Sequence, residues 1–229
     1  MSSAFASFFD DAAIFPPGNA PLDVAVKAHL DRAATADGRY VGPFVIDEAR
    51  LPALADLLTE PLDIALVTRT PVASDRGTRE REGAGEVESP LVHVVAVEGP
   101  GGHVVEKPWG SGFEVPDGAI LKLRCGGDYV PTVAELSDAI TYCVEHNQPF
   151  KLTAGLHAAI THDGGHGFVN VMAAVVAVMH GKEACSALMA WADELDLATL
   201  GEARRLFRSI GTCSIDEPLA DLRHLGLIR

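Results

Sequence analysis

Two short stretches decide the fold class of this chain: Ala119-Ile-Leu-Lys122-Leu-Arg124-Cys-Gly-Gly and Phe150-Lys151-Leu-Thr153-Ala-Gly-Leu-His. Each places a lysine inside an apolar run, a second polar side chain two residues later and a glycine four residues later. Because side chains alternate between the two faces of a strand, Lys122 and Arg124 share one face, as do Lys151 and Thr153. The pattern therefore predicts two strands that point cations into a shared interior. Burying an ammonium is costly unless it is paired or solvated, so a polar pocket is expected there.

Strand and helix patterns alternate along the chain, and no linker divides it. Strands are predicted at residues 12–15, 40–46, 62–68, 91–97, 119–124, 149–154 and 209–212, with weaker extended segments at 104–107 and 113–115. Helices are predicted at residues 22–34, 48–58, 132–146, 167–191 and 200–207, and from 214 to about 226. This alternation predicts an α/β fold with a largely parallel sheet, in one domain over residues 1–229. A TIM-like (β/α)8 barrel is the architecture that fits the strand count.

Two regions depart from a regular barrel. Between residues 97 and 119 the chain is too short for two crossover helices, since a parallel connection needs about a dozen residues or more. The barrel is expected to be irregular or to lack helices there, to contain an antiparallel excursion, or to be the wrong architecture. The charged stretch at 70–89 has little helical periodicity and is predicted to be a loop with at most a short helix.

Composition narrows the classes of partner. The chain has 229 residues, a formal net charge of -14 and a hydrophobic share of 48%. Nonspecific binding of nucleic acid or acidic membranes rests on clustered lysine and arginine, so neither is expected. There is no basic, apolar leader and no apolar run long enough to span a bilayer, and the four cysteines are widely spaced without a C-x-x-C pair. A cytoplasmic protein with a small anionic metabolite as its partner is expected.

In a barrel, the active site lies at the carboxyl ends of the strands. Lys122 and Arg124 approach the end of one strand, and Lys151, Thr153 and His157 lie on and after the next, so we expect these side chains to be neighbours in space. Three glycines follow these strands and would let the backbone approach a ligand closely: Gly126, Gly127 and Gly155.

A glycine-rich loop opens the longest predicted helix. It reads Thr161-His-Asp-Gly-Gly165-His166-Gly167-Phe-Val-Asn170. Free backbone N–H groups and the helix dipole favour an anion at such an N-terminus, although the loop is also compatible with a simple turn and helix cap. We expect Gly165, Gly167 and Asn170 to contact the anion and His166, like His157, to move protons; both histidines are also compatible with ordinary surface positions.

Carboxylates border the predicted strands. Asp11 and Asp10 border the first, and Glu98 closes the fourth, where these carboxylates could supply acid–base function or hold a lysine in its charged form. His162 and His166 have a spacing that suits a metal on a helix, but Gly164 and Gly165 between them make a helix improbable, so no metal site is predicted. The Gly-x-Gly-x-x-Gly and Walker patterns are absent, and no cofactor is predicted.

Each candidate also has a purely structural interpretation. Lys122, Arg124 and Lys151 could pair with Glu98 or Asp11 as an ion network that only supports the barrel. Cys125 and Cys213 lie near strand ends and would be nucleophiles if neighbouring cations lowered the pKa of their thiols, although such cysteines are more often small core residues.

The strand-end lysines resemble the arrangement of aldolase-type (β/α)8 barrels, over about forty residues. Lys-Leu-Thr-Ala-Gly, from Lys151 to Gly155, is similar to the lysine-threonine-glycine strand ends of deoxyribose-phosphate-type aldolases. In class I aldolases, burial and a neighbouring positive charge lower the pKa of one lysine, and its neutral amine forms a Schiff base with a carbonyl substrate. The resemblance implies that Lys122 or Lys151 is the nucleophile.

Three functional hypotheses follow. The leading one is a lyase that acts on a small anionic carbonyl compound through a Schiff-base lysine, with Arg124 as an anion ligand. The second is an isomerase or hydrolase that uses Asp11, Glu98, His157 and His166 for acid–base or metal-assisted chemistry, while the lysines neutralise an anion. The third is a non-catalytic binding protein that forms a homodimer through the apolar helix at 169–191.

Overall fold

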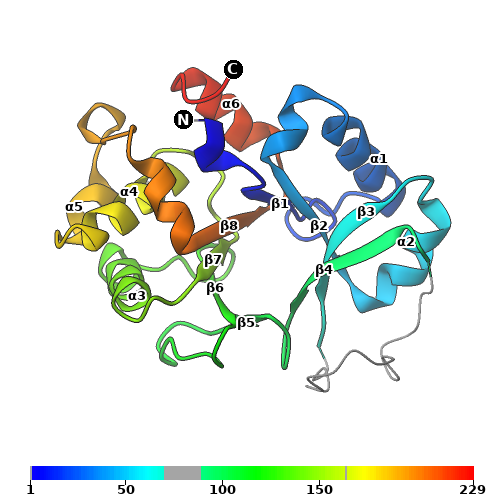
Figure 1. Ribbon diagram of the computed structural model, residues 1–229, viewed down its shortest axis with the longest axis horizontal. Coiled ribbons are helices and arrows are strands. Elements are labelled where there is room, and N and C mark those ends of the chain that lie inside the picture. Colours follow the sequence, from blue (N-terminus) through cyan, green and yellow to red (C-terminus); the bar gives the residue numbers. More distant parts are fainter. Residues whose placement is uncertain (1, 70–88, 163) are drawn as a thin grey trace.

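Eight parallel strands close into a barrel in a computed structural model that describes residues 2–69, 89–162 and 164–229 (Figure 1). The strands follow one another around the barrel in chain order, and the first pairs with the last, Asp10 lying opposite Gly211. Their bounds are β1 Phe9–Asp11, β2 Val41–Asp47, β3 Leu62–Val67, β4 Val92–Glu98, β5 Val104–Glu106, β6 Ile120–Arg124, β7 Phe150–Thr153 and β8 Phe207–Thr212. The predicted α/β fold with a parallel sheet is confirmed as a closed α/β barrel.

Helices surround most of this barrel. They are α1 Leu22–Ala33, α2 Leu51–Leu57, α3 Val133–Glu145, α4 Phe168–Met179, α5 Ala184–Met189 and α6 Asp216–His224. Figure 1 shows α1 and α2 beside β2 and β3, whereas α3, α4 and α5 gather on the opposite side. The start of α3 is well determined by sequence, because Thr132 and Glu135 form the predicted capping box.

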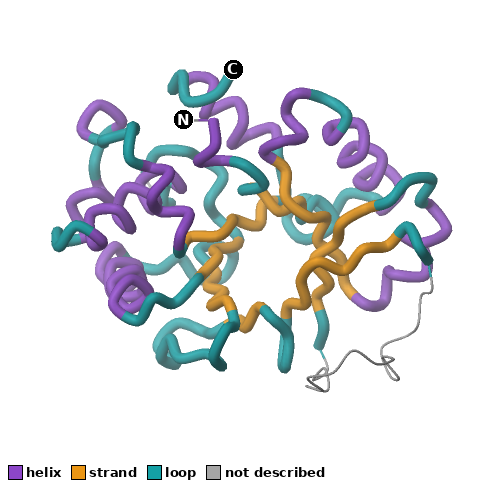
Figure 2. The backbone as a smooth tube through the Cα atoms, viewed as in Figure 1, coloured by secondary structure: helices purple, strands orange, loops and turns teal. Residues whose placement is uncertain are grey.

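Two hydrophobic clusters fill the space between the layers. The larger packs α3, α4 and α5 against β6, β7 and β8, and includes the stacked rings of Phe150 and Phe207, whose centroids lie 4.9 Å apart. The smaller packs α1 and α2 against β2 and β3. The strands themselves form a continuous ring between these clusters (Figure 2).

The region between residues 97 and 119, which was expected to lack helices, has none. Strands β4, β5 and β6 all pair in parallel, and no helix lies between residues 98 and 120 of the described chain. The antiparallel alternative is therefore excluded for these strands. The join between β4 and β5 is short, with Glu98 opposite Val104 as its one register pair, whereas β6 and β7 share four.

Several predicted elements are wrong in detail. The first strand lies at Phe9–Asp11 rather than at 12–15, because the turn before the prolines already occupies those residues. The long helix predicted at 167–191 is two helices, since Gly181 has a φ of 73° just after α4 ends. The segment at 113–115 is not a strand, and the helix predicted at 200–207 is a 3-10 helix, Leu200–Arg205, separated from β8 by Leu206. The loop predicted at 70–89 lies almost entirely outside the described residues.

The apolar sequence of α4 is explained by burial within its own chain. Val169, Val171, Met172 and Val175 are fully enclosed. Beyond α4, the predicted apolar segment exposes Met189 and Trp191, at 60% and 71% of their full accessible area. Dimerisation through this segment therefore stays a prediction. None of the helices in the described part of the chain has the length and apolar character needed to cross a membrane.

Candidate active site

A buried network of charges occupies the carboxyl-terminal half of the barrel interior. Lys151 Nζ lies 2.5 Å from Asp10 Oδ2 and also donates to Glu98 Oε1. Lys122 Nζ lies 2.7 Å from the other oxygen of the same carboxylate, Glu98 Oε2. Lys122 and Lys151 face each other in the β6–β7 register, as the matched sequence pattern predicted. One carboxylate therefore bridges two lysines on neighbouring strands.

The network extends to further strands. Lys122 Nζ is 3.1 Å from Glu106 Oε2 on β5, and Arg124 is 3.9 Å from the other oxygen of that carboxylate. Ser209 Oγ on β8 donates to Asp10 Oδ2 at 2.7 Å. Formal charges balance across this set, because the three carboxylates are matched by Lys122, Lys151 and Arg124.

Burial and pairing shift the pKa values in this network. Burial alone would raise the pKa of Glu98, but Lys151 and Lys122 outweigh it and lower this pKa to about 2. Burial raises the pKa of Asp10 despite the contacts with Lys151 and Ser209. The pKa of Lys151 is raised, because Asp10 and Glu98 outweigh the burial that would lower it. Asp10 and Lys151 thus both hold protons more tightly than usual, and with two acceptors in contact Lys151 stays charged.

A cavity of about 210 Å³ lies over this network at the carboxyl ends of the strands. Glu98, Lys122 and Lys151 contribute to its lining, together with Thr153 and His157. A larger cavity of about 1090 Å³ adjoins it toward solvent and includes Trp109, Tyr129 and the glycines at 126, 127 and 155. The two cavities share six lining residues: Pro16, Pro17, Glu106, Arg124, Ala154 and His157.

The glycines allow two loops to touch. A Cβ atom added at Gly126 would lie 2.7 Å from the backbone nitrogen of Gly155, and one added at Gly155 would lie 2.3 Å from the carbonyl oxygen of Cys125. Gly155 also has a φ of 72°, which side-chain-bearing residues rarely adopt. Close approach of backbone to backbone therefore explains the glycines at 126 and 155.

His157 stands at the rim of the site, on the loop after β7. Its Nδ1 lies 2.7 Å from Glu217 Oε2 on α6, and its Nε2 lies 3.9 Å from Cys213 Sγ. The sequence did not single out Glu217, since nothing in its local pattern distinguishes a carboxylate in the first turn of a helix from an ordinary helix start. Glu106 and Ser209 were likewise missed as members of the network, because their importance depends on barrel closure, whereas Asp10 was named only as a carboxylate that could supply acid–base function or hold a lysine in its charged form.

Asp11 lies apart from the lysines. It follows Asp10 in the same strand, so its side chain points to the opposite face, where its Oδ2 is 3.0 Å from His29 Nδ1 on α1. Its other oxygen accepts from the backbone N–H of Ala13 at 3.2 Å. The structure therefore places Asp11 in the contact between strand and helix, and gives the barrel interior to Asp10.

The glycine-rich loop before α4 is bonded within its own chain. The backbone N–H of Gly165 donates to the carbonyl of His162, and that of Gly167 donates to Thr161 Oγ1. His166 Nε2 is 2.7 Å from the carbonyl oxygen of Pro131.

The side chain of Asn170, in the first turn of α4, is also hydrogen-bonded within the chain. Its Nδ2 donates to the carbonyls of Ala187 and Ala190, while its Oδ1 accepts from the backbone N–H of Thr161. Gly165, His166, Gly167 and Asn170 are absent from the described lining of both cavities. The structure does not bring this loop to the lysines.

Comparison with protein families, curated proteins and solved structures finds no match to this chain. In the described residues, no group of three or more His, Cys, Asp or Glu side chains is arranged to hold a metal ion.

Proposed function

We propose that this chain is an enzyme with a TIM-like (β/α)8 barrel that acts on a small anionic carbonyl compound at the mouth of the barrel. The observation that carries the proposal is the position of Lys122, an ion-paired lysine that lines the smaller cavity beside Arg124. A structural ion pair needs no cavity over it, whereas a lysine that meets a ligand does. The size of the cavity, about 210 Å³, suits a metabolite of a few carbon atoms.

The contacts favour acid–base chemistry. An ammonium group has three N–H donors, and Lys122 donates one to Glu98 and forms an ion pair with Glu106, which leaves an N–H for a carbonyl oxygen. The lysine would stabilise the negative charge that forms on this oxygen when a proton leaves the neighbouring carbon. Arg124, half exposed at the rim, would bind the carboxylate or phosphate, and His157 would move the proton. An isomerase or lyase reaction follows from these roles.

A Schiff base on Lys122 is the second candidate. The specific observation is the sharing of Glu98 by both lysines, which sets a charged Lys151 beside Lys122. Schiff-base formation would require the proton of Lys122 to pass to Glu98 or Glu106 before the amine attacks. Lys151, enclosed and held by two carboxylates, would supply charge rather than react.

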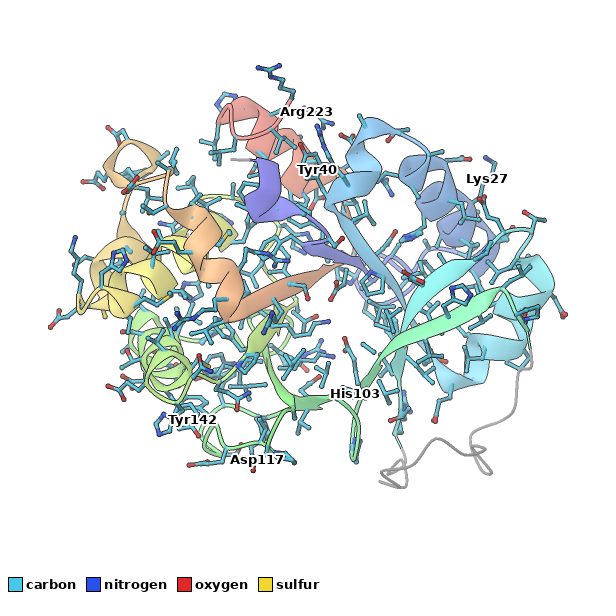
Figure 3. The ribbon with its side chains drawn as sticks, in the orientation of Figure 1. Lys27, Tyr40, His103, Asp117, Tyr142 and Arg223 are labelled. Carbon is cyan, nitrogen blue, oxygen red and sulfur yellow. The ribbon has the colours of Figure 1, made fainter. Side chains whose placement is uncertain are left out.

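Proton exchange in D2O tests the proposal directly. The protein is incubated with a panel of 2-oxo acids and phosphorylated aldehydes and ketones, and 1H NMR follows loss of the signal from the carbon next to the carbonyl. We expect exchange with at least one compound, and we expect Lys122→Met to slow it about 100-fold or more. Lys27→Met is the matched control, because Lys27 forms an exposed ion pair with Asp31 on the outer face of α1 (Figure 3).

Borohydride added during turnover separates the two candidates. A Schiff base leaves a reduced adduct on Lys122 that peptide mass spectrometry locates, whereas acid–base chemistry leaves Lys122 unlabelled. A folded protein that exchanges none of these compounds would contradict the proposed substrate class.

A further inference from the structure

Three side chains at the rim form an arrangement of which the proposed lysine chemistry uses only the histidine. Cys213 directly follows β8, His157 follows β7, and Glu217 lies in the first turn of α6. Sγ of Cys213 is 3.9 Å from Nε2 of His157, and the other ring nitrogen of His157 is 2.7 Å from Glu217 Oε2. A thiol, an imidazole and a carboxylate thus follow one another in a chain of contacts.

We propose that Cys213 is a catalytic nucleophile, with His157 as its general base and Glu217 as the positioning residue that orients the imidazole. The same three roles recur on unrelated folds and are recognised by geometry rather than by sequence order. Cys213 and His157 both line the smaller cavity, so a bound molecule can reach the sulfur. The site lies at the carboxyl ends of two adjacent strands, where barrel enzymes carry their chemistry.

The surroundings of the sulfur fit a thiol that needs a base. Burial raises the pKa of Cys213, and the charge of Glu217 acts in the same direction, while hydrogen bonds from the backbone amides of Gly18 and Cys213 act against them. The resting group is therefore a thiol, and His157 removes its proton as the sulfur attacks. Cys125 and Cys143 are unsuited to act as nucleophiles, because burial raises the pKa of each thiol to about 12 and neither residue lines the smaller cavity.

The chemistry that this arrangement supports is acyl transfer from an ester or thioester. The sulfur bonds to the carbonyl carbon, and its proton passes to Nε2 of His157. The bond to the leaving alkoxide or thiolate breaks, and that group takes the proton from His157. Water, deprotonated by His157, then releases the acyl group as a carboxylic acid and restores the thiol. Since Lys122 and Arg124 line the same cavity, an acyl group that carries a negative charge is favoured.

Acylation with 4-nitrophenyl acetate tests the proposal without knowledge of the natural substrate. We expect a rapid release of about one 4-nitrophenolate per chain, as acyl-enzyme formation requires, with the acetyl group located on Cys213 by peptide mass spectrometry. Cys185, which is partly exposed and also free, is the internal reference. His157→Gln should slow acetylation of Cys213 about 100-fold and leave the rate at Cys185 unchanged.

Variants of Glu217 test whether its carboxylate orients the imidazole of His157 or only supports the fold. Glu217→Gln should slow acetylation of Cys213 about tenfold, and Glu217→Asp should recover part of that loss, because a carboxylate again faces the ring. His180→Gln is the matched control, since His180 forms a similar histidine–glutamate contact, 3.0 Å long, on the surface with Glu202. Equal rates at Cys213 in the wild type and in His157→Gln, or preferential labelling of Cys185, would overturn the proposal.

Discussion

Burial of Lys151 disfavours the positive charge of its ammonium group, and two neighbouring carboxylates stabilise that charge. Its side chain is 5% exposed, and both Asp10 and Glu98 lie in contact with its ammonium group. The cost of removing such a group from water is recovered only while its partners are in place. The residue is therefore a support for the site as well as part of its lining.

Removal of this one charge should destabilise the fold. In Lys151→Met, the buried carboxylates of Asp10 and Glu98 would lose the cation between them, and only Lys122 would remain paired with Glu98. We expect a loss of about 3–5 kcal/mol in the free energy of unfolding. Urea denaturation measures it. Lys27→Met, which removes an exposed ion pair, should change the same quantity by less than about 1 kcal/mol. Equal losses in the two variants would show that the buried network contributes little.

Local sequence patterns predicted some residues of the charged network and not others. The inward direction of Lys122 and Lys151 followed from alternation along a strand, which is a local rule, and their proximity followed from the expectation that consecutive strands are neighbours in a barrel. The separation of Asp10 from Asp11 did not, because the first strand was placed three residues too late and the facing of each aspartate depends on that register. Glu106 and Ser209 join the network only through strand order around the closed barrel, which no local pattern contains.

Among the elements, the loops after β6 and β7 constrain each other. Gly126 and Gly155 permit a backbone contact that any side chain would block, and this contact holds the rim on which Arg124 and His157 stand. The glycine pattern predicted a close approach of backbone to a ligand. What the structure shows is an approach of backbone to backbone, which depends on how neighbouring loops fold over one another.

Gly155→Ala should distort both loops. The new Cβ would meet the carbonyl oxygen of Cys125 at 2.3 Å, and the φ of 72° is unfavourable for alanine, so we expect about 2–4 kcal/mol of destabilisation. Thermal unfolding followed by circular dichroism measures the effect. Gly201→Ala is the matched control, because nothing lies within 4 Å of its added Cβ and its φ is not positive. A similar melting temperature for both variants would contradict this account of the loops.

At the scale of the whole molecule, the network joins six strands of the barrel, from β1 to β8, through side chains of both signs. Its acid sensitivity should therefore be a property of the fold. Glu98 has a pKa of about 2 in the folded chain against an ordinary value of 4.5, so its contribution is present above pH 4.5 and is lost as the pH falls toward 2. The pKa of Asp10 is raised, so its contribution to the free energy of unfolding has the opposite sign: it decreases as the pH rises above the ordinary value of 3.8.

A comparison of variants isolates the contribution of Glu98. At neutral pH the wild type should exceed Glu98→Gln by about 3 kcal/mol in the free energy of unfolding, and this difference should shrink between pH 4.5 and 2. Urea denaturation at a series of pH values gives both curves. Asp31→Asn, on the exposed surface of α1, should track the wild type throughout. A difference for Glu98→Gln that persists undiminished at pH 2 would contradict the lowered pKa.

The join between β4 and β5 has a consequence for anyone who wishes to redesign this protein. Its strands share one register pair, and Lys122 on β6 holds a carboxylate from each of them, Glu98 and Glu106. Under the proposed function Lys122 contacts the ligand, and it also links the two strands that share the fewest register pairs, so a library varied at Lys122 would mix inactive variants with unfolded ones. Arg124 and Thr153, half-buried or exposed at the rim and outside that join, are the positions at which new specificity can be selected while the barrel stays closed.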